Sequence, residues 1–199
     1  MSSALIIIDI QNDFCGGGAL AVKDGETIIE HINLVQKDFD TIILTQDWHP
    51  EEHTSFASNH NAEAYSNMEM DYGSQVLWPD HCIQGSIGAK FHPNLNHEKA
   101  DAIIRKGSNP SVDSYSAFFE NDKVTPTGLH GYLKDRDVTD LTLVGLATDY
   151  CVAFSAVDAA KLGYSVTVRL DMARAIDNGG SLNSAIDKMS KAGVNLENG

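Results

Sequence analysis

The sequence predicts an α/β fold, with a Rossmann-like three-layer α/β/α arrangement around a mainly parallel central sheet. Three observations support this prediction. Short apolar segments of strand length alternate along the chain with segments whose apolar residues recur at helical spacing. The first apolar segment, residues 4–8, contains no polar residue, which is typical of a strand covered on both faces. Four of these segments also lead into residues that can carry out chemistry, as expected where parallel strands end at one edge.

The expected elements follow in a regular order over the first fifty residues. A strand over about residues 4–9 is followed by a Gly-rich loop that ends at Gly25. A helix over residues 26–39 comes next, because its isoleucine, valine and phenylalanine side chains fall on one helical face. A second strand over about residues 41–46 follows after a single polar break.

The second half of the chain repeats this alternation. Its expected strands lie at about residues 101–106, 141–146 and 165–170. Its expected helices lie near residues 129–134, from 151 to 162, and over 182–191. Gly163 and Gly193 follow the last two helices, in the position where a helix commonly ends. Strands that alternate with helices in this way predict a parallel sheet covered on both faces.

Residues 50–100 lack convincing periodicity. A stretch of this length without regular structure is either functional or conceals an unrecognised element. It contains seven residues that favour a functional role: His53, His60, Trp78, His81, Cys82, His92 and His97. We therefore expect residues 1–199 to form a single domain, in which a long loop or lid at about residues 50–100 forms one wall of the site.

Composition restricts the classes of partner. The formal net charge is -14, with 28 acidic against 14 basic residues, which argues against nucleic acid or an anionic membrane as a partner. No apolar segment is long enough to span a bilayer. The first residues lack the charged region and cleavage site of a signal peptide, and the three cysteines lack disulfide-like spacing. We therefore expect a cytoplasmic protein.

Cys151 is the strongest candidate nucleophile. It follows the strand at 141–146 and falls in the first turn of a helix, where the helix dipole favours a thiolate. Lys106 could stabilise that thiolate, and Asp9 could accept its proton. Each residue also has a simpler interpretation, since free cysteines usually pack as small hydrophobic residues and a lysine after a strand is usually solvated. An acid that ends a fully apolar strand, however, needs a partner.

A second group of residues has the chemistry of a metal site. Asp47 and His49 are two positions apart, so in extended chain both side chains point the same way. His53 or His81 would provide a third ligand. Two imidazoles and one carboxylate suit Zn²⁺, Fe²⁺ or Mn²⁺. The alternative is that these residues are solvated members of a turn.

Several further residues lie on expected loops. Four of them are aromatic and could form the wall of a pocket for a flat substrate, or could simply anchor their loops: Phe14, Trp48, Trp78 and Tyr115. Cys15 and Cys82 are expected to be structural. A Cys₂His₂ zinc site formed by these cysteines with His49 and His81 is an alternative, although it lacks a close cysteine pair.

Six sequence blocks, which lie in order between residue 5 and about 178, resemble those of nicotinamidases in the cysteine-hydrolase branch of the isochorismatase-like superfamily. The blocks are Asp9-Ile10-Gln11-Asn12-Asp13-Phe14-Cys15, Asp47-Trp48-His49-Pro50, Trp78-Pro79-Asp80-His81-Cys82, Arg105-Lys106-Gly107, Asp113-Ser114-Tyr115-Ser116-Ala117-Phe118 and Gly145-Leu146-Ala147-Thr148-Asp149-Tyr150-Cys151-Val152. The last block is typical of the cysteine hydrolases. The second and third narrow the resemblance to nicotinamidases.

This resemblance implies a role for each candidate residue. The implied catalytic triad is Asp9, Lys106 and Cys151. The implied ligands of one divalent metal ion are Asp47, His49 and His81, with His53 as a further candidate. Zinc is the first choice of ion, and iron or manganese are the alternatives.

The resemblance also implies how a substrate is held. The Leu146–Ala147 peptide bond would be cis, and the backbone N–H groups of Ala147 and Cys151 would form an oxyanion hole. Three aromatic side chains would enclose the pyridine ring: Phe14, Trp78 and Tyr115. The implied activity is hydrolysis of nicotinamide to nicotinate and ammonia through a Cys151 thioester in NAD salvage, with pyrazinamide also accepted, by a monomer or a homo-oligomer.

Three other functions remain open from the sequence. A related amide hydrolase acting on a carbamoyl or ureido substrate would need the triad but not the metal ligands. A non-haem Fe(II) oxygenase would use two histidines and one carboxylate, although the alternating α/β pattern argues against it. A non-catalytic metal-binding domain would have no need of the Asp9, Lys106 and Cys151 set.

Overall fold

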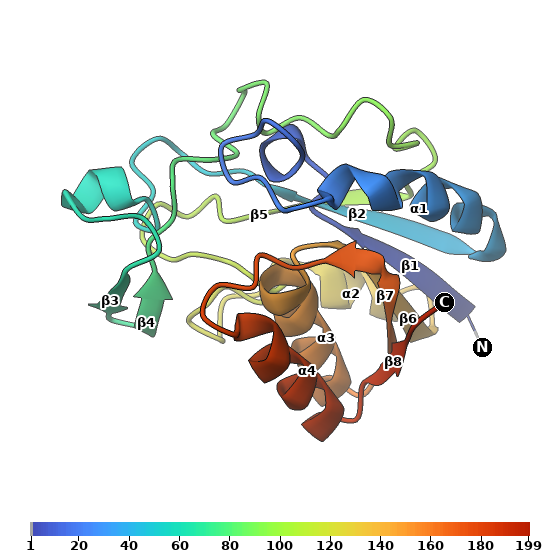
Figure 1. The fold of residues 1–199 in the computed structure, drawn as a ribbon. Coiled ribbons are helices and arrows are strands. Elements are labelled where there is room, and N and C mark those ends of the chain that lie inside the picture. Colours follow the sequence, from blue (N-terminus) through green and yellow to red (C-terminus); the bar gives the residue numbers. More distant parts are fainter. Residues whose placement is uncertain (1) are drawn as a thin grey trace.

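The computed structural model describes residues 2–199, and its centre is a six-stranded parallel sheet (Figure 1). The strands are β1 (Ser2–Ile8), β2 (Thr41–Asp47), β5 (Ala102–Lys106), β6 (Val138–Leu146), β7 (Ser165–Arg174) and β8 (Asn195–Glu197). Their spatial order is β5-β2-β1-β6-β7-β8. Counted along the chain within this sheet, that is the order 3-2-1-4-5-6 of the Rossmann fold. The predicted fold class is therefore confirmed.

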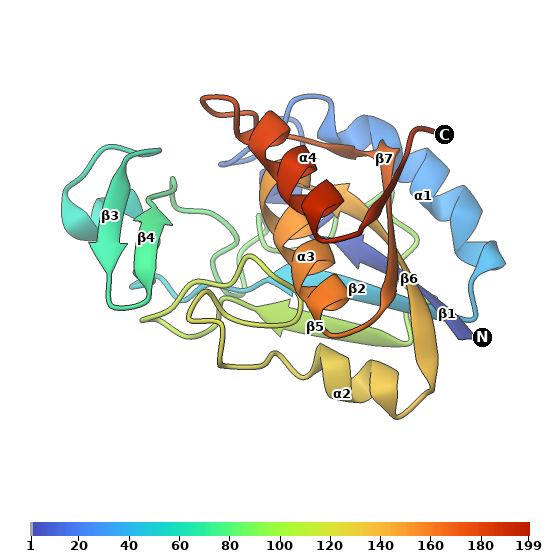
Figure 2. The ribbon, with the colours of Figure 1, turned by 90° about the horizontal axis from the view of Figure 1, so that it is seen from below.

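Helices cover both faces of the sheet (Figures 1 and 2). The helix α1 (Ile29–Val35) lies on one face, and α2 (Leu129–Lys134), α3 (Ala153–Lys161) and α4 (Ser181–Lys191) lie on the other. Alternate residues of β1 contribute to the two cores: Leu5 and Ile7 pack with the α1 layer, whereas Ile6 and Ile8 pack with the α3 layer. Both faces of β1 are therefore buried, which explains why its sequence is apolar throughout.

Several elements differ in extent from the prediction, and the short strand β8 was not predicted. The helix expected over 26–39 is α-helical only in α1 and is flanked by 3₁₀ segments at Gly25–Ile28 and Gln36–Asp38, as is common at helix ends. The strand expected at 165–170 continues to Arg174 as β7. A register shift between Leu143 and Gly145 of β6 accompanies this extension. Such an irregularity depends on pairing between distant strands, so local periodicity does not reveal it.

The segment between β2 and β5 contains a hairpin that the sequence pattern did not predict. The antiparallel strands β3 (Asn67–Met70) and β4 (Gly73–Val76) form a separate two-stranded sheet, which projects away from the main one (Figure 2). Single bridges connect other parts of the segment, such as that between Phe56 and Trp78. The hairpin is short and partly exposed, so it carries little hydrophobic alternation.

The carboxyl ends of the central strands define the position of a ligand site. In the Rossmann order the crevice lies between the first and fourth strands, here β1 and β6. β1 leads into Asp9, and β6 leads through a π-helical turn, Thr148–Val152, into α3. Single π-turns of this kind often occur at functional sites. Within residues 2–199, no helix combines the length and the apolar character needed to cross a membrane.

Candidate active site

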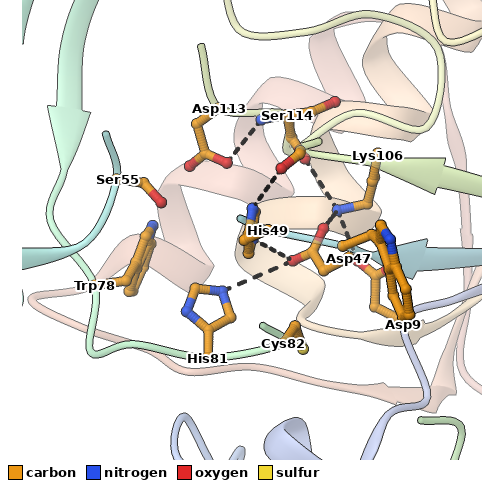
Figure 3. A network of polar contacts seen from close by, with 12 residues as sticks. Asp9, Asp47, His49, Ser55, Trp78, His81, Cys82, Lys106, Asp113 and Ser114 are labelled. Atoms are coloured by element: carbon orange, nitrogen blue, oxygen red, sulfur yellow. Dashed lines mark hydrogen bonds and ion pairs between the residues drawn. The ribbon is translucent and has the colours of Figure 1, made fainter. Parts of the chain in front are cut away.

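Lys106 is the centre of a buried polar network at the end of β5 (Figure 3). Its Nζ donates to a carboxylate oxygen of Asp47, to the Ser114 carbonyl oxygen at 3.0 Å and to Cys151 Sγ at 3.3 Å. The same atom lies 2.9 Å from Asp9 Oδ2 in an ion pair. An ammonium group has three N–H donors, and these three hydrogen bonds use all of them. The structure therefore brings together the three residues predicted as a triad.

Asp9 retains an open acceptor in this network. Thr45 Oγ1 donates to Asp9 Oδ1 at 2.6 Å, whereas Oδ2 accepts no hydrogen bond. A carboxylate oxygen of Asp9 lies within 4.8 Å of Cys151 Sγ. Asp9 itself has φ of 48°, a left-handed conformation that aspartate adopts more readily than most residues. The geometry thus leaves Asp9 free to accept a proton from the thiol.

The ionisation of this network differs from the sequence-based prediction for Cys151. Burial raises the pKa of the Cys151 thiol well above its usual range, and Asp9 and Asp47 raise it further against the opposing effect of Lys106. Burial also raises the pKa of Asp9, although the Lys106 ammonium opposes this. Burial disfavours the charged form of Lys106, but the two carboxylates outweigh it and hold its pKa well above the usual value. The free site therefore holds a neutral thiol beside a charged lysine, not a preformed thiolate.

Asp47, His49 and His81 form a group with the chemistry of a metal site. One potential ligand atom from each lies within 4.8 Å of the others, and all three residues are buried. His49 Nε2 and His81 Nε2 lie 3.5 Å and 3.8 Å from the same oxygen, Asp47 Oδ2. The other ring nitrogen of each histidine faces a backbone carbonyl at 2.8 Å, which fixes the tautomer that leaves Nε2 free to ligate. These residues fit a divalent ion such as zinc.

Asp47 belongs to both groups of residues. Its Oδ1 contacts the Lys106 ammonium, while its Oδ2 faces the two histidines. Burial would raise the pKa of Asp47, but Lys106 and His49 hold it well below the usual value, so the carboxylate is charged. The two constellations that appear separate in the sequence therefore share one side chain.

Gly107 fixes the position of His49. Its carbonyl oxygen lies 2.8 Å from His49 Nδ1, and its φ is 65°. A Cβ atom at this position would lie 2.3 Å from the His49 ring. Only glycine combines this backbone conformation with this close approach. The glycine of the Arg105-Lys106-Gly107 block is thus required by packing against a metal-site histidine.

A small, narrow pocket of about 20 Å³ opens in front of Cys151. Its lining includes Asp47, His81 and all three aromatic residues predicted to hold a ring: Phe14, Trp78 and Tyr115. Trp78 Nε1 donates to the Tyr115 hydroxyl at 3.1 Å, and the two rings pack edge to face. Trp48 is not among the residues that line this pocket. The guanidinium carbon of Arg105 lies 3.9 Å from the centre of the Trp48 ring. The pocket therefore has aromatic walls and a polar end formed by the metal-site residues.

Other predicted residues occupy different positions. The Leu146–Ala147 peptide bond is cis, as the resemblance implied, and Ala147 and Cys151 line the pocket. Within residues 2–199, Cys15 and Cys82 are buried and belong to no group of metal-binding side chains, so the Cys₂His₂ alternative has no support.

His53 is buried next to His49, with a distance of 4.3 Å between ring centres. It is grouped with His49 and Asp113, not with Asp47 and His81. Burial and the adjacent His49 lower the pKa of His53 to about 4, so its ring is neutral.

Several residues that shape the site were not recognised from the sequence. Gln11 is buried; its side-chain amide donates to the Asp47 carbonyl at 2.9 Å and accepts from the Asp47 N–H at 2.8 Å. The Asp13 carboxylate accepts a hydrogen bond from the Cys82 N–H at 2.7 Å, which fixes the position of the loop that contains His81. Asp113 lines the pocket. Gln11 and Asp13 lie in the first resemblance block, but nothing in their spacing indicates these long-range contacts.

The chain matches the Isochorismatase domain over residues 3–197, and it belongs to the isochorismatase family. It is 50% identical over 192 residues to the nicotinamidase of Acinetobacter baylyi, in an alignment covering 96% of this chain and 90% of that protein.

Two solved structures extend this comparison. The nicotinamidase/pyrazinamidase of Acinetobacter baumanii has a TM-score of 0.97 and 51% identity, covering 98% of this chain and 95% of its own. The pyrazinamidase of Pyrococcus horikoshii in complex with zinc has a TM-score of 0.81 and 32% identity, with 100% of both chains covered.

Proposed function

We propose that this protein is a nicotinamidase, a metal-dependent amide hydrolase that converts nicotinamide to nicotinate and ammonia through a thioester on Cys151. The observation that carries the proposal is the position of Lys106. Its ammonium group contacts Asp9, Asp47 and Cys151 at once, and the last two of these line a pocket with aromatic walls. The 50% identity to the nicotinamidase of Acinetobacter baylyi supports the choice of substrate.

In the first half of the reaction, Cys151 acts as the nucleophile. Its Sγ forms a bond to the carboxamide carbon while the thiol proton moves to Asp9 Oδ2, the acceptor that the free site leaves open. Lys106 stabilises the negative charge that develops on sulfur. The charge on the carboxamide oxygen is met by the backbone N–H groups of Ala147 and Cys151, where each such donor contributes about 3–4 kcal/mol in comparable sites.

The intermediate then collapses, and the carbon–nitrogen bond breaks. Asp9 returns its proton to the departing nitrogen, which leaves as ammonia, and the acyl group remains on Cys151 Sγ. In the second half, a water molecule attacks the thioester carbon while Asp9 accepts a proton from it. The carbon–sulfur bond breaks and Asp9 reprotonates the sulfur, while the product leaves as nicotinic acid and loses its remaining proton to solvent to give nicotinate. Asp9 therefore serves as base and acid in turn, which suits a carboxyl whose pKa burial has raised.

The proposed metal ligands are Asp47, His49 and His81, and the proposed ion is zinc, the ion in the complex of the Pyrococcus horikoshii relative. When bound, the ion supplies a Lewis acid that can fix the ring end of the substrate. Phe14, Trp78 and Tyr115 would hold the ring itself through their faces and edges. The same pocket would accept pyrazinamide, whose ring has the same shape.

The wider setting follows from this activity. Production of nicotinate from nicotinamide places the protein in NAD salvage and pyridine nucleotide biosynthesis. Three free cysteines support a cytoplasmic location. We propose that residues 1–199 act as one isochorismatase-like hydrolase domain, either as a monomer or as a homo-oligomer, with residues 50–100 as the lid over the pocket. The small molecule is its proposed partner, with neither nucleic acid nor membrane required.

The direct test is ammonia release from nicotinamide by the purified, zinc-loaded protein, with Cys151→Ala beside it. We expect release by the wild type and none above background by the variant. If the wild type releases no ammonia with zinc, iron or manganese supplied, the proposed substrate is wrong. Carbamoyl and ureido substrates would then be tested with the same assay.

A further inference from the structure

His53 contains a fully buried polar atom without a partner. The side chain is 0% exposed, and within residues 2–199 its Nε2 makes no hydrogen bond. Its ring packs against those of His49 and Phe56, with distances of 4.3 Å and 5.7 Å between ring centres. A buried polar atom that lacks a partner costs about 1–3 kcal/mol, so Nε2 requires one.

The hydrogen bonds of the other ring nitrogen identify what kind of partner is needed. The Ser55 backbone N–H donates to His53 Nδ1 at 3.3 Å, and Ser55 Oγ lies 2.7 Å from the same atom. Nδ1 therefore carries the lone pair. In a neutral imidazole the proton is then on Nε2, which makes that atom a donor. This is the opposite tautomer from His49 and His81, whose Nδ1 atoms face carbonyl oxygens.

A matching acceptor lies across a short gap. Asp113 is a buried carboxylate that lines the pocket and accepts from Ser114 N–H at 2.7 Å and from Gln75 Nε2 at 2.8 Å. A ring nitrogen of His49, a ring nitrogen of His53 and an oxygen of Asp113 lie within 4.8 Å of one another. Within residues 2–199 no direct hydrogen bond joins His53 Nε2 to this carboxylate, because Nε2 has no partner. One water with hydrogen bonds of about 2.8–3.0 Å on each side can join a donor and an acceptor at such a separation.

We propose that His53 and Asp113 are positioning residues that hold one water molecule between them beside His49, and that His53 is not a metal ligand. The His53 Nε2–H donates to the water, and the water donates one hydrogen to the Asp113 carboxylate. Its second hydrogen is available to a substrate acceptor at the polar end of the pocket. This inference rests on the ligand set and substrate of the proposed function, and it assigns the recognition of the substrate ring partly to ordered water.

Histidine tautomers in the zinc-loaded wild type provide a test that needs no turnover. Long-range ¹H–¹⁵N correlation spectra distinguish Nδ1–H from Nε2–H in each neutral ring. We expect Nε2–H for His53 and Nδ1–H for His49 and His81. A His53 ring that is protonated on Nδ1, with Nε2 lacking a proton, would overturn the inference, because that is the form of a metal ligand.

Two substitutions test the donor itself. His53→Gln retains an N–H donor near the position of Nε2, whereas His53→Leu removes it. His81→Gln serves as a matched control for loss of a metal ligand, and the remote His97→Gln controls for surface effects. We expect both His53 variants to retain one zinc per chain. We expect His53→Leu to raise the KM for nicotinamide about tenfold with a smaller effect on kcat, and His53→Gln to stay within about threefold of the wild type.

Either of two results would contradict the inference. Loss of zinc from His53→Leu to the extent seen in His81→Gln would make His53 a ligand. An equal effect of both His53 substitutions on KM would show that the donor is not what matters. If the protein does not act on nicotinamide at all, the tautomer measurement still decides whether His53 is a donor, so the two proposals can fail separately.

Discussion

The central sheet and the irregular segment between β2 and β5 contribute different parts of the site. The residues proposed to surround the reacting bond lie at or shortly after the ends of strands in the sheet: Asp9, Lys106 and Cys151. The irregular segment contributes residues proposed to hold the metal and the ring: His49, Trp78 and His81. Asp47, the last residue of β2, contacts both sets. On the proposed function, regular structure positions the reacting groups, whereas the irregular segment contributes to holding the metal and the substrate.

The two regions are also held in place by different forces. The strand ends follow β1 and β6, whose apolar residues are buried between two helical layers. The irregular segment buries apolar side chains such as Ala89 and Leu95, but also depends on individual polar contacts, such as those of Asp13 with the Cys82 backbone and of Gly107 with His49. Substitutions in the two regions should therefore produce different combinations of lost activity and lost metal.

The largest effect is expected at a strand end. Asp9→Asn removes the open carboxylate acceptor while preserving the shape of the side chain. We expect kcat/KM for nicotinamide to fall about 10²–10⁴-fold, because general acid and base catalysis is lost at both steps. Zinc content, measured by atomic absorption, should remain one per chain. A kcat/KM within tenfold of the wild type would mean that Asp9 does not move the proton.

The next effect concerns the contact between the two regions. Gly107→Ala places a Cβ atom against the His49 ring, so we expect zinc affinity to fall about 10–100-fold and activity to recover partly in excess zinc. Gly85→Ala is the matched control, because Gly85 also has positive φ but open space around it. Equal zinc affinity in both variants would show that the collision with His49 has no consequence.

A smaller effect is expected for the wall of the pocket. Trp78→Leu removes an aromatic surface and the donor to Tyr115, so the KM for nicotinamide should rise about 10- to 100-fold with a lesser change in kcat. Trp48→Leu, which removes a tryptophan that stacks on Arg105 outside the pocket, should leave KM within about twofold. Steady-state kinetics measure the KM for nicotinamide in both variants. Equal KM values would show that Trp78 does not contact the substrate.

The smallest effect is expected far from both regions. Lys191 pairs with Asp187 one helical turn away on α4, with both side chains largely exposed. Lys191→Ala should reduce the free energy of unfolding by no more than about 0.5 kcal/mol, and kcat/KM should not change. Urea unfolding followed by circular dichroism measures the first quantity. A loss of several kcal/mol would indicate that α4 is held in place differently from the description above.

The sequence predicted the sheet better than the irregular segment, for a physical reason. β1 is buried on both faces, so its composition alone reveals it, and the position of Lys106 follows from the end of an apolar strand. The hairpin β3–β4 buries little apolar surface and leaves no comparable pattern. The spacing of Asp47 and His49 predicted a metal site but left His53 and His81 as equal candidates.

Local sequence patterns could not predict the contacts that join distant segments of the chain. Gln11 is bound to the Asp47 backbone 36 positions away, and Asp113 lies near His53 only after the loops have folded. Both depend on tertiary approach, not on spacing. The prediction of a thiolate at Cys151 considered the helix dipole and Lys106 but not burial, which raises the pKa of the thiol.

The central claim is that the strand ends and the irregular segment have separate roles. Zinc content and nicotinamide binding in Cys151→Ala, measured together by metal analysis and calorimetry, test it most directly. The account predicts one zinc per chain, bound nicotinamide and no release of ammonia. Loss of zinc from this variant, or ammonia release at the wild-type rate, would contradict it.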